Sequence, residues 1–225
     1  MTRSPSLDRS RWVSHIESMI AGVLEPVPFD ADVASRVGYI ESFHDEFGNR
    51  RASDRAFLAH LLGVSISPVR PFDQMSLDER LWWCVADNTS IPSGLIGLSD
   101  ALLFDPDALA IEFRTMVELG ALQAFWTVAL REKDRELCER AMNAARWHID
   151  ELQPDNAINR PWGLPVFVEL AIAGSDETVA QTADLHAQTL LHNACINFGK
   201  PDLLSALILR DSVELLKQAD QWADF

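Results

Sequence analysis

Apolar residues recur at intervals of three and four along nearly the whole chain, which is the spacing of one helix face. Strand-like alternation is almost absent. The pattern predicts ten helices, over about residues 8–23, 30–47, 53–62, 76–88, 95–104, 106–130, 134–152, 162–173, 177–198 and 201–219. We therefore expect an all-α fold of about ten helices, either an irregular bundle or a short array of antiparallel helical hairpins.

Local signals place several helix ends. Ser76 and Glu79 have the spacing of a capping box, in which each side chain bonds the backbone N–H of the other residue. Asp105 followed by Pro106 is typical of a helix start, since proline at the first helical position loses no hydrogen bond. Gly199 is expected to end the helix 177–198 in a left-handed conformation.

The segment 64–75 contains two prolines and no helical period, so it is a candidate linker. On this interpretation residues 1–63 form an N-terminal helical segment and residues 76–225 form the main helical-hairpin domain. The length of 225 residues is equally compatible with one continuous domain over residues 1–225.

The helix 106–130 is apolar on nearly every face, which predicts a central, buried position. The hairpins 106–152 and 162–198 also match at an offset of 42 residues. The matched positions are Phe125 and Phe167, Ala129 and Ala171, Leu130 and Ile172, Asp134 and Asp176, Leu137 and Val179, Ala141 and Ala183, and Ala145 and Ala187. Either the two hairpins are repeats of one unit, or two amphipathic hairpins match by coincidence.

One segment resembles known helical families. Residues 129–155 resemble a hairpin of a tetratricopeptide-like array. Trp147 and the run Gln153-Pro154-Asp155 also resemble the helix-to-loop transition of α/α-toroid proteins. The tetratricopeptide period of 34 residues is not met, and Asn156 stands where toroid loops usually have glycine. The sequence therefore identifies no family.

Charge and composition exclude several functional classes. The chain carries 19 Lys and Arg against 34 Asp and Glu, a formal charge of −15, and 48% of its residues are hydrophobic. This apolar content excludes a disordered chain. The excess of acids argues against binding to nucleic acid or to an anionic membrane. A protein is therefore the expected kind of partner, whereas nucleic acid and membrane are not expected to bind. The oligomeric state is left open.

The chain has neither an apolar signal sequence near residues 1–11 nor an uninterrupted run of about 18 apolar residues. Cys84, Cys138 and Cys195 are widely separated, without the spacing of a metal site or a disulfide framework. We therefore expect a cytoplasmic protein with neither a metal nor a cofactor.

The helix 177–198 has an unusual distribution of polar residues. Asp184, Gln188, His192 and Cys195 form one stripe, and Thr182, His186, Thr189 and Asn193 form another. Buried polar groups need partners, so these stripes predict either a pocket lining or a buried helix that bonds neighbouring loops. In the first interpretation His186 and His192 are the candidate catalytic residues, and Gln188 and Asn193 are candidate ligand-binding residues.

The loop 147–163 is the second candidate site. It contains His148, Asp155, Arg160 and Trp162, which we consider candidate ligand-binding residues, because a flat apolar ring and a charged fork suit carbohydrates and peptides. In the alternative interpretation Trp147 and Trp162 are core residues, and Asp155 and Arg160 form a salt bridge across the loop.

Two further pairs have the spacing of neighbours on a helix. Glu41 and His44 have the ExxH spacing of di-metal proteins, but a second ExxH is absent and a surface role is simpler. Arg114 and Glu118 predict a buried ion pair that orients a neighbouring loop. Nucleotide-binding and hydrolase motifs are absent.

Two functions follow from these features. The first is a protein-interaction or scaffold module that binds its partner in a groove between helical hairpins. The alternative is an enzyme, or a binder of a small carbohydrate-like molecule, with a pocket between helix 177–198 and loop 147–163. The alternative predicts that His186, His192 and Trp162 converge on one accessible pocket.

Overall fold

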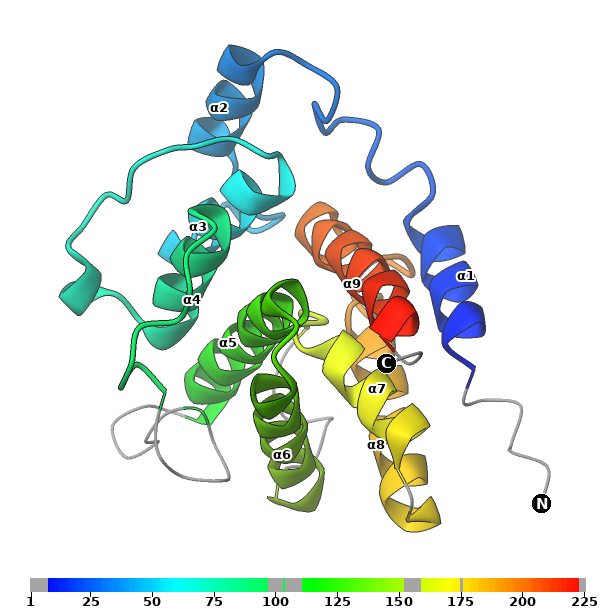
Figure 1. Cartoon of the computed structure of the whole chain (residues 1–225). Helices are drawn as coiled ribbons and strands as arrows, with labels where there is room; N and C mark the ends of the chain where they lie inside the picture. The colour runs from blue at the N-terminus through cyan, green and yellow to red at the C-terminus, as the bar shows by residue number, and fades with distance from the viewer. Residues whose placement is uncertain (1–7, 97–102, 104–110, 152–158, 175, 223–225) are drawn as a thin grey trace.

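The described part of the chain consists of α-helices and connecting loops, without a β-strand. The computed structural model describes residues 8–96, 103, 111–151, 159–174 and 176–222. Its helices are α1 (Arg9–Ile20), α2 (Val33–Ser42), α3 (Ala52–Leu61), α4 (Leu77–Ala86), α5 (Ile111–Glu132), α6 (Arg135–Glu151), α7 (Leu164–Ala173), α8 (Glu177–Asn193) and α9 (Leu203–Trp222). The predicted all-α class is confirmed, and the helices pack as a bundle (Figure 1). Most of the predicted helix 95–104 and the Asp105-Pro106 start lie outside the described residues.

Aspartate side chains fix the starts of four helices. Asp8, Asp32, Asp134 and Asp176 precede α1, α2, α6 and α8 and accept hydrogen bonds from backbone N–H groups of the first helical turn. The closest of these bonds are 2.7–2.9 Å long. Such caps satisfy N–H groups that have no partner within the helix, which explains why these helices begin where they do.

The predicted capping box at the start of α4 is wrong. Ser76 precedes the helix, but its hydroxyl lies 2.5 Å from an oxygen of Asp78 and does not bond a backbone N–H. The buried Glu79 side chain pairs with Arg70 of the preceding segment. A carboxylate that is buried needs a cation or several donors, so the ion pair takes precedence over the cap.

Two helices, α2 and α8, each end five residues earlier than the apolar pattern predicts. α2 stops at Ser42 because Phe43 is extended and the Asp45 carboxylate accepts from the backbone N–H groups of Phe47 and Asn49, at 3.0 and 2.7 Å. α8 stops at Asn193, not at residue 198. Local side-chain and backbone bonds thus replace helical ones in both segments.

The helix α5 lies at the centre of the bundle, as predicted. It packs against α4, α6, α7 and α9, and every residue from Val117 to Leu130 is buried. The buried Gln123 side chain joins α5 to two other elements. Its oxygen accepts from the N–H of Gly163 at 3.0 Å, and its amide donates to Asp211 of α9 at 2.7 Å.

The two predicted hairpins place their matched residues in similar surroundings. Phe125, Ala129, Ala141 and Ala145 are buried, as are Phe167, Ala171, Ala183 and Ala187. Asp134 caps α6 and Asp176 caps α8 in the same way. True repetition of one unit stays a prediction that these similarities favour.

Residues 64–75 run between α3 and α4 and include one short 3-10 turn, Phe72–Gln74. The two helices nevertheless pack against each other. Phe57 of α3 contacts Trp82 of α4 and Trp162, with ring centroids 4.9 Å apart in both pairs. One cluster of buried apolar side chains runs from Trp12 to Ala219. Whether residues 1–63 fold by themselves stays a prediction.

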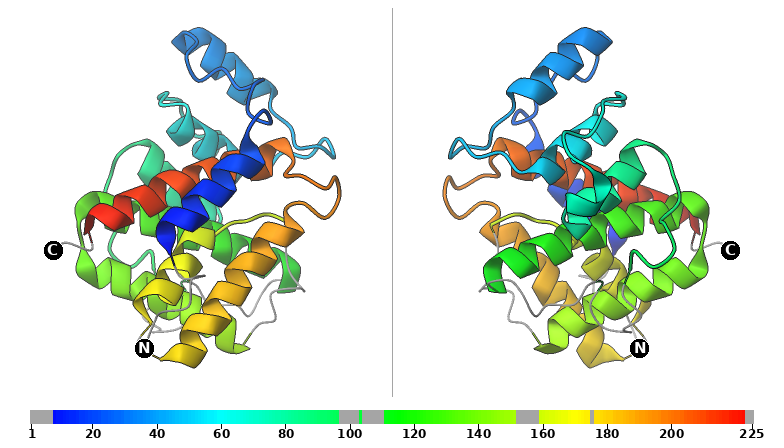
Figure 2. Two further views of the ribbon diagram at one scale, coloured as in Figure 1. Left: turned by 90° about the vertical axis from the view of Figure 1, so that its right-hand side faces the viewer. Right: turned by 90° about the vertical axis from the view of Figure 1, so that its left-hand side faces the viewer.

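The helix α1 is attached to the far end of the chain. It packs against α9 and α7 and buries Trp12, Ile16 and Ile20 (Figure 1). Arg9 bonds both carboxylate oxygens of Glu169 in α7, at 2.6 and 2.7 Å, and Asp220 in α9 at 2.6 Å. These contacts hold α1 on the side of the molecule where α8 also lies (Figure 2). In the described residues, every helix is too short or too polar to cross a membrane.

Candidate functional site

A groove separates α1 from α8 and has a volume of about 590 Å³. Its described lining consists of Arg11, Trp12, His15 and Met19 from α1, and of Asp184, Gln188, Leu191, His192, Cys195 and Gly199 from α8 and the following turn. The first polar stripe of the sequence is therefore one wall of this groove. Buried or half-buried Trp12, Met19 and Leu191 supply its apolar surface, while Arg11, His15 and His192 are exposed.

Asp184 is the most deeply buried polar side chain of the groove, with 7% of its surface exposed. One carboxylate oxygen accepts from the Gln188 amide at 2.6 Å. The other oxygen is buried and has no hydrogen-bond partner among the described residues. A buried polar atom without a partner costs free energy, so this oxygen marks the position where a ligand donor fits best.

Two predicted site residues, Gln188 and His192, lie together in this groove. Asn193 is half-buried and is not part of the described lining. Cys195 is half-buried, and burial together with the charge of Asp202 raises the pKa of its thiol. A thiol whose pKa is raised is a poor nucleophile at neutral pH, so Cys195 contributes packing and a weak donor.

The second polar stripe faces away from the groove. His186 is buried and stacks on Phe167, with ring centroids 4.2 Å apart and planes 26° apart. The hydroxyl groups of Thr182 and Thr189 donate to backbone oxygens one turn earlier in α8, at 2.8 and 2.9 Å. Thr182 and Thr189 are therefore satisfied within the helix, and His186 is buried in the core.

His148 lies on the other side of Phe167, and their ring centroids are 6.3 Å apart. Its side chain is buried, and its Nε2 atom has no hydrogen-bond partner among the described residues. Burial, with smaller effects of His186 and Arg114, lowers the pKa of His148 to about 3. Burial lowers the pKa of His186 to about 4. Both rings are therefore neutral at physiological pH.

The loop candidates are separated from the groove. Trp162 is buried between Phe57 and Trp82. Arg160 forms ion pairs with Asp45, Glu46 and Asp202, at 3.1, 3.1 and 2.5 Å. These pairs join the loop to the segment after α2 and to the start of α9. The predicted bridge to Asp155 lies outside the described residues.

The predicted convergence of His186, His192 and Trp162 on one accessible pocket is not found. His192 is exposed in the groove, whereas His186 and Trp162 are buried in the core. The three side chains do not converge because His186 and His192 lie on different faces of α8, and because Trp162 packs into the aromatic core against Phe57 and Trp82. Their individual roles as catalytic or binding residues stay predictions.

The contribution of α1 to this site was not predicted. Trp12, His15 and Met19 have helical spacing and share one face of α1, which is the sequence signal for this wall of the groove. Three large apolar side chains next to the groove were also missed as a group. Leu185, Ile196 and Phe198, on α8 and the turn after it, are 59%, 59% and 54% exposed.

A cluster of buried carboxyl groups lies elsewhere, between α3, α4 and α5. Asp54, Asp78, Glu79 and Glu118 are each at most 3% exposed. Arg51 pairs with Asp78 at 2.7 Å, and Glu118 accepts from the N–H of Leu103 at 2.5 Å. Glu118 thus bonds the segment before α5, and the Arg114–Glu118 ion pair that orients a neighbouring loop stays a prediction.

The ExxH pair does not form a site in the described residues. Glu41 pairs with Arg55 and Arg50, and His44 is exposed beyond the end of α2. Groups of three or more potential metal ligands are also absent from the described part of the chain.

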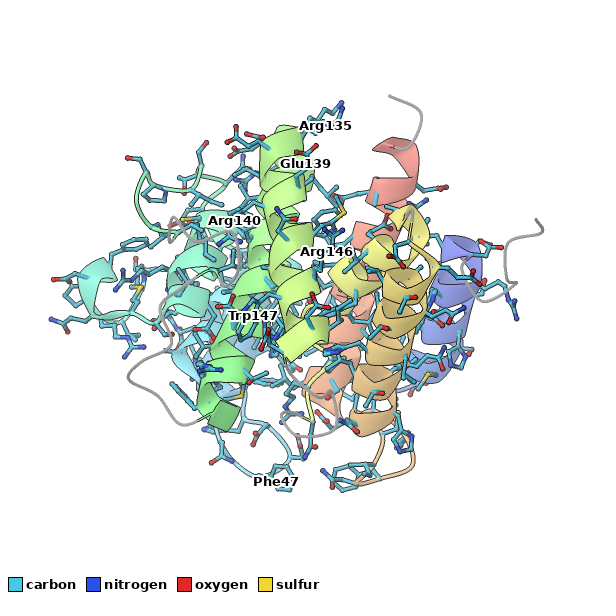
Figure 3. The ribbon with its side chains drawn as sticks, turned by 90° about the horizontal axis from the view of Figure 1, so that it is seen from below. Phe47, Arg135, Glu139, Arg140, Arg146 and Trp147 are labelled. Atoms are coloured by element: carbon cyan, nitrogen blue, oxygen red, sulfur yellow. The ribbon has the colours of Figure 1, made fainter. Side chains whose placement is uncertain are left out.

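A second hollow, of about 580 Å³, lies between residues 90–96 and the helices α5 and α6. Figure 3 shows Arg135, Glu139 and Arg140 on α6, and Glu139 and Arg140 line the hollow. Three of the four acids of this hollow already have partners: Glu139 pairs with Arg135 at 2.9 Å, Glu132 pairs with Arg131 at 3.3 Å, and Asp134 caps α6. We therefore take the groove between α1 and α8 as the candidate functional site.

Comparisons of this chain with known protein families, with curated proteins and with solved structures found no significant match. The site consequently rests on the geometry of the groove, and its function is inferred from the residues that line it.

Proposed function

We propose that this chain is a protein-interaction module, and that it binds a segment of its partner in the groove between α1 and α8. The observation that carries the proposal is the surface of α8 beside the groove. From Leu185 to Gly199 the chain contains no Asp, Glu, Lys or Arg, although charged residues make up 24% of the sequence. Interfaces are depleted of charge at their centres, so such a surface favours a partner protein.

The exposed apolar side chains extend this surface beyond the groove. Leu185, Gln188 and His192 have the spacing i, i+3 and i+7, so they share one face of α8. Ile196 and Phe198 continue the apolar surface after the helix ends, each more than half exposed. Contiguous exposed apolar groups with a polar rim are typical of protein-binding sites.

Phage display tests the proposal. Random 12-residue peptides are selected for binding to the immobilised full-length chain. We expect enriched peptides whose affinity, measured by calorimetry, falls at least roughly tenfold in Leu185→Asp, because the change places a charge on the apolar surface beside the groove. Val69→Asp is the matched control, since Val69 is 71% exposed and lies outside the groove.

Circular dichroism establishes that both variants remain folded. The proposal is overturned if repeated selection enriches no peptide, or if Leu185→Asp and Val69→Asp bind the enriched peptides equally well.

The size of the groove supports a second candidate, a small ligand such as a saccharide. A volume of about 590 Å³ falls in the range of small-molecule sites. Thermal unfolding of the protein with a panel of mono- and disaccharides tests this candidate. The candidate is supported if a sugar raises the unfolding temperature of the wild type and of the surface variant His44→Ala, but not that of His192→Ala. Absence of stabilisation at millimolar concentration rejects it.

We also propose a cytoplasmic location and no role in nucleic-acid binding. Cys84, Cys138 and Cys195 are all free, which is in keeping with a reducing compartment. The formal charge of −15 disfavours phosphate backbones. Both statements remain proposals that rest on composition.

A further inference from the structure

We propose that the groove recognises a positively charged side chain, Lys or Arg, in the partner segment, and that Asp184 is the residue that receives it. The inference rests on the proposed function, because it specifies the chemistry of the segment that binds between α1 and α8. Two observations carry it: a buried, unpartnered oxygen on a carboxylate that lines the groove, and a neighbouring apolar surface that suits the stem of a long cationic side chain.

The carboxylate of Asp184 is held in the wall of the groove with half of its hydrogen-bonding capacity unused. Its Oδ2 atom accepts from Gln188, while Oδ1 is buried and lacks a partner among the described residues. A carboxylate only accepts hydrogen bonds, so the missing group is a donor. A cationic donor gains most here, since charge-assisted bonds are about twice as strong as neutral ones.

Gln188 is the group that a ligand would displace. Its side chain is exposed, and its amide bonds Asp184 from one helical turn further along α8, at 2.6 Å. Rotation of an exposed glutamine side chain costs little, because several of its rotamers are open to solvent. An incoming ammonium or guanidinium can therefore replace the amide and reach the carboxylate.

The neighbouring apolar surface suits the stem of Lys or Arg. Trp12, Met19 and Leu191 line the groove together with Asp184. Long cationic side chains lay their methylene groups along apolar surface and attract an indole ring through their charge. The combination of one buried acid and one tryptophan thus favours a cation over a neutral donor.

The wall of the groove that holds Asp184 carries no Lys or Arg, and Arg11 is the one such cation in the described lining. α8 and the turn after it contain no Lys or Arg from Glu177 to Gly199. The cation on the opposite wall, Arg11, lies near Asp8, whose pKa is lowered chiefly by hydrogen bonds from Ser10 and also by the charge of Arg11. The chain as a whole carries a formal charge of −15, which attracts basic segments over a longer range.

Three peptide libraries that differ only in a fixed central residue test the inference. The central residue is Lys, Leu or Glu, and each library is selected on the full-length wild-type chain, on Asp184→Asn and on Asp87→Asn. Asp87→Asn is the matched control, because Asp87 is an exposed acid at the end of α4. We expect the Lys library to be enriched on the wild type and on Asp87→Asn, and to lose at least roughly tenfold of its enrichment on Asp184→Asn.

A double-substitution cycle confirms the contact. The best Lys peptide and its norleucine analogue, which keeps the stem and removes the charge, are titrated into the wild type and Asp184→Asn. We expect each single change to weaken binding at least roughly tenfold and the second change to add little, because both remove the same contact. The norleucine peptide makes this test independent of any effect that Asp184→Asn has on folding.

The outcomes separate this inference from the proposed function. The role of Asp184 is overturned if the Leu library is enriched equally on the wild type and on Asp184→Asn, or if the two changes in the cycle have additive effects. Either result leaves the groove as a binding site. Failure of all three libraries on the wild type overturns the proposed function itself.

Discussion

Buried ionisable side chains make the stability of this protein depend on pH in two opposite ways. His148 and His186 are buried around Phe167, and their pKa values of about 3 and 4 lie below the ordinary value of 6.5. Burial raises the pKa of Asp54 to about 6, against the opposing hydrogen bond and charge of Arg51. Asp78 also raises it and Arg160 lowers it. The histidines resist protonation in the folded state, whereas Asp54 favours it.

Acidification below pH 6.5 is expected to destabilise the protein through the histidines. The unfolded chain binds their protons from about pH 6.5 downward, and the folded chain binds them only near pH 4 and 3. Each histidine therefore lowers the free energy of unfolding by up to about 1.4 kcal/mol per pH unit in this window. His186→Phe, which keeps a ring against Phe167, is expected to reduce this slope in urea titrations between pH 4 and 6.5. An unchanged slope, equal to that of the surface variant His44→Ala, would contradict this assignment.

Asp54 is expected to act in the opposite direction. Its folded pKa of about 6 lies above the unfolded value of 3.8, so it stabilises the folded state at low pH and loses that contribution as the pH rises through 6. Asp54→Asn should therefore raise the free energy of unfolding at pH 8, by an amount on the order of 1–3 kcal/mol. It should also steepen the loss of stability between pH 6 and 4. A variant that is less stable than the wild type at pH 8 would show that the ionised Asp54 is stabilised by Arg51.

At the scale of elements, polar contacts join helices that also share the apolar core. Gln123 of α5 bonds Gly163 before α7 and Asp211 of α9. Gly163 has φ of +75°, and an added Cβ atom would lie 3.4 Å from Leu119 and Leu122. The chain can turn into α7 at this point only because glycine adopts a left-handed backbone without steric cost.

Replacing Gln123 with Leu is expected to lower the free energy of unfolding by about 2–4 kcal/mol. The change leaves the buried N–H of Gly163 without an acceptor and removes a donor from Asp211. Gln181→Leu is the matched control, because the exposed Gln181 bonds only Glu177 within α8 and should change stability by less than about 0.5 kcal/mol. Equal effects of the two changes in chemical denaturation would contradict the bridging role of Gln123.

The existence of the helices could be predicted from the sequence, but their ends and contacts could be predicted only in part. The apolar pattern predicts a central position for α5 because nearly every face of that helix is apolar. The end of α2 depends on a turn made by the Asp45 side chain, which an apolar pattern does not record. One polar stripe of α8 lines the groove, which is one of the two interpretations that the sequence left open. The contribution of α1 could not be predicted, since α1 is placed by its contacts with α7 and α9, from the opposite end of the chain.

At the scale of the whole molecule, the position of α1 determines whether the groove exists. Arg9 holds α1 against α7 and α9 through Glu169 and Asp220, at 2.6 Å for each nearest contact. Glu169 is buried, so it depends on Arg9 for its charge compensation. A loosened α1 would remove one wall of the groove while the α5-centred core remained intact.

Arg9→Ala is expected to lower the free energy of unfolding by about 2–3 kcal/mol and to speed amide hydrogen exchange in α1. Lys217→Ala is the matched control: it removes an exposed ion pair between α9 and α1, with Glu17 at 3.0 Å, and should cost less than about 1 kcal/mol. Exchange in α1 that stays as slow in Arg9→Ala as in Lys217→Ala would show that apolar packing alone holds the helix.

The most direct test of the central claim is methyl NMR of the full-length chain during titration with the peptide selected from the Lys library. If the partner segment binds between α1 and α8, the methyl resonances of Met19, Leu191 and Ile196 shift with one common dissociation constant, and that of Val69 stays in place. Asp184→Asn should weaken these shifts at the same peptide concentration. Shifts confined to methyl groups away from α1 and α8 would contradict the assignment of the groove as the binding site.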